Sequence, residues 1–111
     1  MIAELILVTG LLAVDGDSVL FRGERIRIMG VDSPEIHCQC ESECRAAWAA
    51  KRFTQNTLDG GAVTIERQGL DKYRRTLARV YVNGQDLAAI IIAAGHGRPY
   101  HGEKRQSWCG Q

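Results

Sequence analysis

The 111-residue sequence has no long hydrophobic run, no internal repeat and almost no net charge. No run approaches the roughly 20 apolar residues that a membrane-spanning helix needs, which excludes a transmembrane protein of that kind. The net charge of +1 gives by itself no reason to expect a polyanionic partner. No Pro/Gly/Ser-rich linker divides the chain, and its length is too small for two domains. We therefore expect one globular domain over residues 1–111.

The first segment is apolar but lacks two features of a secretory signal peptide. The stretch "MIAELILVTGLLAV" has no basic n-region and no small-residue cleavage site, and it continues directly into an Asp-Gly turn. It is typical of a β-strand in which Gly10 favours a bulge or a sharp bend.

Charge is distributed unevenly along the chain. Residues 1–64 contain six Lys/Arg and nine Asp/Glu, a balance of −3, whereas residues 65–111 contain eight and four, a balance of +4. The first part is suited to binding a cation and the second to contacting phosphate. Chance alone also produces such an asymmetry in small proteins.

Residue periodicity predicts three strands, a helix, two strands and a second helix. After the opening strand, "SVLFR" and "RIRIMGV" form a hairpin in which Ile26 and Ile28 share one face and Arg27 points to the other. The segment 42–61 has helical spacing, with Ser42 as N-cap and two glycines as the stop signal.

The second half of the chain continues the pattern. "AVTIER" and "TLARVYV" are strands on either side of the "DKYRR" loop, and "QDLAAIIIAAG" is a short helix after an Asn-Gly turn. Five short strands with a helix after the third are typical of a Greek-key barrel of the OB type. The expected fold class is therefore α+β, mainly β, with two or three helices.

Two carboxylates flank the glycine of "VDGDSV", where the first strand ends. Asp-Gly is a common turn dipeptide, so Asp15 and Asp17 are by themselves turn residues. Calcium prefers carboxylate and carbonyl oxygens, and two acids from separate segments form a weak site that a substrate phosphate completes. Asp17 and Asp32 are the candidates, and Pro34 favours an extended Ser33 whose carbonyl faces the same ion. Asp15 is interpreted as a turn residue or as one that reaches the metal through water.

Three further residues have side chains suited to proton transfer and to phosphate binding. Glu35 follows the acids closely and is suited to orienting or deprotonating an attacking water. Arg27 and Arg75 offer planar sets of donors that bind phosphate and stabilise developing charge. Each residue taken singly is also explained as a loop acid or as a surface ion pair.

The segments "VDGDSV", "RIRIMGVDSPE" and "DKYRRTLARVYVNG" resemble, in order and approximate spacing, the three signature segments of the staphylococcal nuclease-like (thermonuclease) family. The resemblance extends from about residue 3 to about residue 100. It implies a calcium-dependent phosphodiesterase that cleaves DNA and RNA with little sequence preference and leaves 3′-phosphate ends. Transferred by position, it implies metal ligation by Asp17, Asp32 and the Ser33 carbonyl, and catalytic roles for Arg27, Glu35 and Arg75.

Two positions depart from the pattern of that family. Ser33 stands where Thr is usual, which is acceptable if the backbone oxygen is the ligand. Arg74 stands where a glycine usually separates the equivalents of Tyr73 and Arg75. The backbone of this loop is therefore in question, because a glycine there supports a positive φ.

Substrate binding is expected from the "DKY" and "RPY" segments. Lys72 is suited to contacting a terminal phosphate. Tyr73 and Tyr100 are suited to hydrogen-bonding phosphate or stacking on a base, contacts that are largely independent of base sequence. Simple packing at the rim of the site explains Tyr100 equally well.

The four cysteines allow three interpretations. Cys38, Cys40 and Cys44 cluster beside His37, but their spacing lacks the paired knuckles of structural zinc sites. An even count in a small domain favours disulfides, which we assign as Cys40 with Cys109 and Cys38 with Cys44. Disulfides would favour a secreted or periplasmic protein whose signal peptide is missing from this chain. Reduced thiols in a cytosolic protein are the third alternative.

Two main function classes compete. The favoured one is a monomeric calcium-dependent nuclease acting on single-stranded or denatured DNA and RNA, without a membrane partner. The alternative is a non-catalytic nucleic-acid-binding module, because some domains of this family keep the barrel and lose the acids. This chain keeps Asp17, Asp32 and Glu35, which favours the enzyme. A structural metal module built on the cysteines is a third class.

Overall fold

The computed structural model describes residues 4–110, so residues 1–3 and residue 111 of the expected domain lie outside the described part. The larger sheet has the strand order β1-β6-β7-β4-β3-β2 and includes β8 beside β7. Its strands are β1 (Leu5–Val8), β2 (Leu12–Asp15), β3 (Ser18–Phe21), β4 (Glu24–Ile28), β6 (Val63–Leu70), β7 (Thr76–Val82) and β8 (Gln85–Asp86). A smaller sheet pairs β5 (Gly30–Asp32) with β9 (Arg98–Tyr100). The helices are α1 (Glu41–Asp59) and α2 (Leu87–Ala93).

The sheet has the arrangement of an OB-type barrel, which confirms the predicted mainly β fold class. Its two edges, β1 and β2, are successive segments of the expected first strand, separated by a bend at Gly10 with φ of 77°. β1 pairs with β6, whereas β2 pairs with β3. Within residues 4–110 no backbone hydrogen bonds pair β1 with β2. The sheet is therefore curved like a barrel but is not closed.

The core lies between the sheet and the two helices. In β7 buried and half-buried side chains alternate along "TLARVYV", as its period-two pattern predicts. Ile26 and Ile28 of β4 are fully buried in the same core. α1 packs along β2, and α2 packs between β5 and β7. Neither helix of the described chain combines the length and apolar character that crossing a membrane requires.

The first turn of α1 begins differently from the sequence prediction. Its N-cap is Cys40, not Ser42, and the cap makes no side-chain hydrogen bond. Glu43 of the first turn accepts the backbone N–H of Gln39, the residue before the cap, at 2.7 Å through its Oε1, which ties the preceding loop to the helix. The helix stops before Gly60, as predicted.

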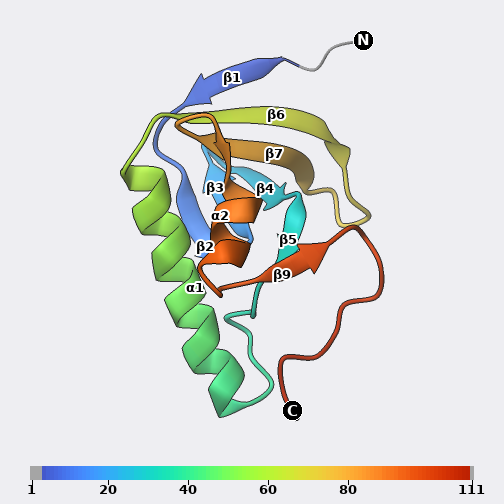
Figure 1. Ribbon diagram of the computed structural model, residues 1–111. Coiled ribbons are helices and arrows are strands. Elements are labelled where there is room, and N and C mark those ends of the chain that lie inside the picture. The colour runs from blue at the N-terminus through green and yellow to red at the C-terminus, as the bar shows by residue number, and fades with distance from the viewer. Residues whose placement is uncertain (1–3, 111) are drawn as a thin grey trace.

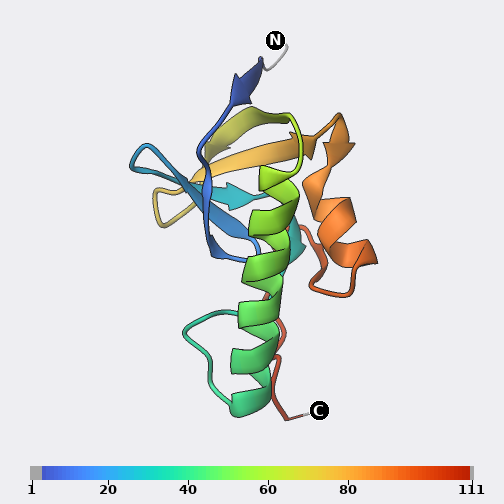
Figure 2. The ribbon, with the colours of Figure 1, turned by 90° about the vertical axis from the view of Figure 1, so that its left-hand side faces the viewer.

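Two disulfides hold the lower part of the molecule together. They join Cys38 with Cys44 and Cys40 with Cys109, the pairs assigned above, with Cα–Cα distances of 5.1 and 6.1 Å. The chain after β9 therefore returns beside the start of α1, and the half of α1 that projects below the barrel is flanked by this segment and by the loop after β5 (Figures 1 and 2).

Candidate functional site

The site forms where the β2–β3 turn meets the end of β5. Gly16 lies so close to α1 and the next loop that an added Cβ would be 2.7 Å from Ala50 Cβ and 2.8 Å from Ser33 Oγ. The Thr54 hydroxyl of α1 donates to the Gly16 carbonyl at 2.6 Å. The Asp-Gly-Asp sequence therefore forms a turn, as its composition indicates, and α1 holds that turn against the β5 end. Asp15 shares this role, since its carboxylate accepts the Ile36 N–H at 2.9 Å.

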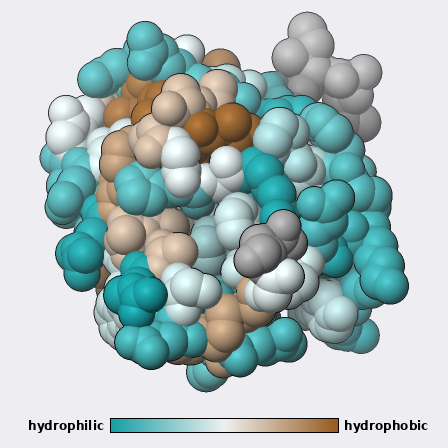
Figure 3. Space-filling view, turned by 60° about the horizontal axis from the view of Figure 1, so that its bottom comes forward, coloured by the Kyte–Doolittle hydropathy of each residue, from teal (hydrophilic) through white to brown (hydrophobic). Residues whose placement is uncertain are grey.

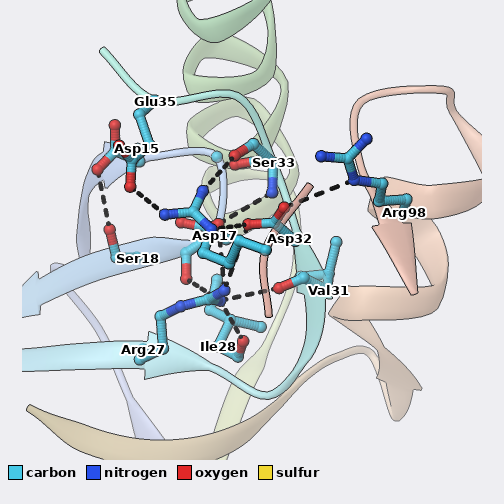
Figure 4. Close-up of polar contacts among 12 residues, drawn as sticks. Asp15, Asp17, Ser18, Arg27, Ile28, Val31, Asp32, Ser33, Glu35 and Arg98 are labelled. Carbon is cyan, nitrogen blue, oxygen red and sulfur yellow. Dashed lines mark hydrogen bonds and ion pairs between the residues drawn. The ribbon is translucent and has the colours of Figure 1, made fainter. Parts of the chain in front are cut away.

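Acidic groups from two segments, the β2–β3 turn and residues 32–35, gather there (Figure 4). We call Asp17, Asp32, Glu35 and the Ser33 carbonyl the acid cluster. Asp17, Asp32 and Ser33 are 5%, 1% and 0% exposed. Asp17 Oδ2 accepts the backbone N–H of Ser33 at 2.9 Å, which ties the turn to the β5 end. Glu35 is half exposed, with 45% of its side chain accessible.

Arg27 of β4 is the cation beneath this cluster, and it is itself buried. Its Nη1 donates to the carbonyls of Ile28 and Val31, both at 2.8 Å, and to that of Asp17 at 3.3 Å. Its Nη2 lies 3.4 Å from Asp17 Oδ2 and 3.8 Å from Asp32 Oδ1. Arg27 points away from the apolar face of β4, as predicted, and much of its donor capacity is used to organise the backbone around the site.

The electrostatics of Asp17 are dominated by burial. Burial raises the pKa of the Asp17 carboxyl, although the Arg27 guanidinium and the Ser33 N–H lower it. The nearby carboxylates of Asp15 and Asp32 raise it further. The negative charge at this position is therefore incompletely compensated within the described residues.

The donor set suits a hard divalent cation. Asp17, Asp32 and the Ser33 carbonyl offer only oxygen atoms, which is the ligand type that calcium prefers. Asp32 Oδ2 is buried and, within the described chain, has no hydrogen-bond partner. Arg98 Nε lies 3.6 Å from this oxygen. An unpartnered buried carboxylate oxygen is costly unless a cation or water satisfies it, so the residues present fit the ion that the resemblance implies.

The cysteines do not form a metal site. In this structure all four are in disulfides and no free cysteine occurs in residues 4–110, so it contains neither the zinc site nor the reduced thiols of the two alternatives. Cys40, Glu43 and Cys109 do approach one another, but sulfur in a disulfide is not a thiolate ligand.

A cleft of about 1110 Å³ lies above the acid cluster. It is lined by all the catalytic and substrate-binding residues expected from the sequence, namely Arg27, Glu35, Lys72, Tyr73, Arg75 and Tyr100. The predicted metal ligands Asp17, Asp32 and Ser33 are buried beside it, connected through Arg27.

The loop between β6 and β7 carries Arg75 into this cleft. Asp71 accepts the backbone N–H groups of Tyr73 and Arg75 at 2.8 and 2.9 Å, and its Oδ2 accepts Arg75 Nε at 2.7 Å. Although desolvation raises it, the pKa of Asp71 is lowered overall by these bonds to Arg75 and Tyr73. Arg74 has φ of 65°, so the loop does adopt the left-handed conformation for which a glycine is suited.

Sequence reasoning missed two cations of the site, Arg98, whose Nε lies 3.6 Å from Asp32 Oδ2, and Arg105. Arg105, from the segment after β9, donates from Nε to Asp32 Oδ1 at 2.7 Å and from Nη2 to the Ser33 carbonyl at 3.3 Å, and its Nη1 pairs with Glu35 Oε1. No local pattern marks Arg105. The one available signal was the pairing of Cys40 with Cys109, which brings the end of the chain back to the loop after β5.

Comparisons with known proteins agree with the geometry. Residues 25–108 match the staphylococcal nuclease homologue family. The chain is 35% identical over 86 residues to a thermonuclease of Staphylococcus intermedius, covering 72% of this chain and 51% of that protein. It is 33% identical over 90 residues to an uncharacterized protein of Bacillus anthracis, covering 75% and 42%. The chain thus spans about half the length, or less, of these curated relatives.

Proposed function

The chain belongs to the staphylococcal nuclease homologue family, and from that premise we propose that it is a calcium-dependent phosphodiesterase. Its substrates would be DNA and RNA, cleaved with little sequence preference to leave 3′-phosphate ends. Family membership supports a nuclease-type function, and calcium dependence and product ends are our proposal. The observation that carries it is the cleft in which Glu35, Arg27 and Arg75 meet beside a buried pair of carboxylates.

Asp17, Asp32 and the Ser33 carbonyl would hold the ion. Calcium bound there would neutralise charge on a substrate phosphate. Glu35 is the candidate base, because its half-exposed carboxylate can accept a proton from water. In the resting structure Glu35 is paired with Arg105, so the base must exchange this partner for water during turnover.

The two arginines would stabilise the negative charge that develops on the transferring phosphate. Arg27 donates from Nη1 to backbone carbonyls, and its Nη2 faces Asp17. Because Arg27 also lines the cleft, the rest of its guanidinium would contact the substrate phosphate. Arg75 is held by Asp71 through Nε, so its two terminal nitrogens would be available to phosphate oxygens in the cleft that Arg75 lines. Planar guanidinium donors match the geometry of phosphate oxygens.

Nucleic acid would be held without base-specific contacts. Tyr73 is 62% exposed at the cleft, with Lys72 Nζ 5.3 Å and Arg75 Cζ 5.6 Å from its ring centre. An exposed aromatic ring beside two cations suits stacking on an unpaired base next to its phosphate. We therefore propose single-stranded or denatured substrates, bound by a monomer.

The alternative, a non-catalytic nucleic-acid-binding module, has one observation in its favour. Arg105 contacts Asp32 Oδ1, the Ser33 carbonyl and Glu35 without a metal ion, as a module that has no use for the ion would require. Such a module would bind denatured DNA equally with and without calcium and would release no nucleotides.

The two disulfides bear on where the protein works. Disulfides persist in oxidising compartments and are rare in reducing ones. We accordingly propose a secreted or periplasmic setting. Retention of both disulfides in protein recovered from the periplasm or the medium, measured by thiol alkylation and mass spectrometry, would support this.

The catalytic assignment is tested by turnover on denatured DNA in calcium. Glu35→Gln should lose about 10²- to 10⁴-fold in rate, the usual contribution of a general base. Arg75→Lys should lose roughly 10²-fold in rate. Its neighbour Arg74→Lys is the control and should keep near-normal turnover, because the Arg74 side chain is exposed. Products of the wild-type protein should block terminal-transferase extension until phosphatase removes their 3′-phosphates. Near-normal turnover of Glu35→Gln, or equal loss in the two arginine variants, would contradict the assignment.

A further inference from the structure

The segment 101–110 crosses the proposed metal site and puts a cation in it. Arg105 makes all three of its side-chain contacts with the acid cluster, to Asp32, the Ser33 carbonyl and Glu35. The first two groups are proposed metal ligands and the third is the proposed base. Arg105 therefore occupies, with one positive charge, two of the oxygens that a divalent ion would need, Asp32 Oδ1 and the Ser33 carbonyl, and leaves Asp32 Oδ2 without a hydrogen bond in the described chain.

Asp32 shows how strongly this position attracts positive charge. Its side chain is 1% exposed, and three guanidinium groups lie within 4 Å of it. Arg27 and Arg98 approach to 3.8 and 3.6 Å, whereas Arg105 makes the hydrogen bond of 2.7 Å. Although partial burial opposes its charge, the carboxylates of Glu35 and Asp32 hold the pKa of Arg105 above its ordinary value. Arg105 enters from the surface, because 37% of its side chain is exposed.

Residues 106–109 are held by contacts with Arg98 and by the disulfide to Cys40, and these contacts fix the position of Arg105. The Arg98 guanidinium carbon lies 3.8 Å from the centre of the Trp108 ring. Arg98 Nη2 also donates to the carbonyls of Gln106 and Ser107. Cys109 is bonded to Cys40 at the start of α1. The segment is therefore held by polar, cation–aromatic and covalent contacts. Seen from below, the surface of the molecule carries both hydrophilic and apolar residues (Figure 3).

We propose that Arg105 is an internal competitor of the divalent metal ion, so that calcium enters the acid cluster only when the Arg105 guanidinium leaves. The inference rests on the calcium site of the proposed function. Arg105 Nε and Nη2 use Asp32 Oδ1 and the Ser33 carbonyl, and the same oxygens cannot simultaneously accept these hydrogen bonds and bind an ion at full strength. The apparent calcium affinity is then the intrinsic affinity multiplied by the fraction of molecules in which Arg105 is out.

The Cys40–Cys109 disulfide sets how well Arg105 competes. Only three residues separate Arg105 from Cys109, so the bond keeps the guanidinium near the cluster at a high effective concentration. Opening this bond should weaken the competitor without altering any metal ligand. Metal affinity thereby depends on the path of the chain end as well as on the ligands.

The test is calcium binding by isothermal titration calorimetry, with calcium chloride as titrant, the full chain and no substrate. Arg105→Gln should bind calcium about tenfold or more tightly than the wild type, as expected if Arg105 is out in about a tenth of the molecules. Lys104→Gln is the matched control. It removes one positive charge from an exposed side chain at the position next to Arg105, and it should change calcium affinity less than about twofold. The double variant Cys40→Ser, Cys109→Ser should also bind more tightly, and its urea midpoint in chelator reports whether it is folded.

The outcomes separate the two proposals. Equal or weaker calcium binding by Arg105→Gln, beside a wild type that binds, overturns the competitor and leaves the calcium site intact. A gain in Arg105→Gln that Lys104→Gln matches also overturns it, since general charge removal would then suffice. No binding at millimolar calcium by the wild type and by Arg105→Gln overturns the calcium site of the proposed function, and the inference with it.

Discussion

Removing the charge of Arg27 should destabilise the fold, apart from any effect on catalysis. Its Nη1 serves two buried carbonyls at 2.8 Å, and its Nη2 faces Asp17 and Asp32, which are 5% and 1% exposed. Arg27→Met keeps the apolar stem but leaves these acceptors and carboxylates without their cation. Breaking a buried ion pair by removing one partner costs about 3–5 kcal/mol of unfolding free energy.

The loss should depend on pH in a defined direction. Arg27 lowers the pKa of Asp17, so without it the carboxyl retains its proton to higher pH than in the wild type. Once Asp17 is protonated, no unpaired negative charge remains there, so the penalty for losing Arg27 shrinks. We expect the destabilisation by Arg27→Met to be smaller at pH 5 than at pH 8.

The measurement is urea unfolding in chelator at both pH values, followed by tryptophan fluorescence. Arg25→Met is the control, because Arg25 lies on the same strand and lines the same cleft but is exposed, and it should cost less than about 0.5 kcal/mol. If Arg27→Met costs no more than Arg25→Met, or costs the same at both pH values, Arg27 is not the buried counter-charge of the site.

Two further predictions concern single positions. Because burial raises the Asp17 pKa above 3.8, the native state holds that proton more tightly than the unfolded chain, and stability is lost as pH rises from about 3.8 through the raised pKa. Asp17→Asn, which keeps the acceptor for the Ser33 N–H, should therefore be more stable than the wild type at pH 8 but lose calorimetric calcium binding; lower stability at pH 8 would contradict this. Arg74→Gly should raise the unfolding free energy by about 0.5–1 kcal/mol in urea titrations, because a left-handed backbone costs a non-glycine residue about 1–2 kcal/mol and part of the gain is offset in the unfolded chain. A loss would show that the Arg74 side chain stabilises the loop.

Much of the fold followed from local patterns. The alternation in "TLARVYV", the Asn-Gly turn and the bend at Gly10 each depend on the residues themselves, and each occurs as expected. Ser42 is not the N-cap, because α1 begins at Glu41 with Cys40 as its cap. Cys40 is bonded to Cys109, a partner 69 residues away that local spacing does not reveal.

The candidate site likewise combines residues that the sequence predicted with residues that it did not. The acids near the β2–β3 turn and the "DKYRR" loop were recognisable because each lies within a short segment whose spacing is that of a known family. Arg105 was not recognisable, since its contact with Asp32 joins residues 73 apart and depends on where the chain end is fastened. The partners that hold it, Trp108 on Arg98 and Cys109 on Cys40, act only once the fold has formed.

The most direct test of the proposed function is the release of acid-soluble nucleotides from denatured DNA by the purified chain, in calcium and in an excess of calcium chelator. A calcium-dependent nuclease releases nucleotides in calcium, and release stops in the chelator. Equal release in both conditions would contradict the calcium requirement, and release in neither, by a folded chain that retains both disulfides, would contradict the enzyme itself.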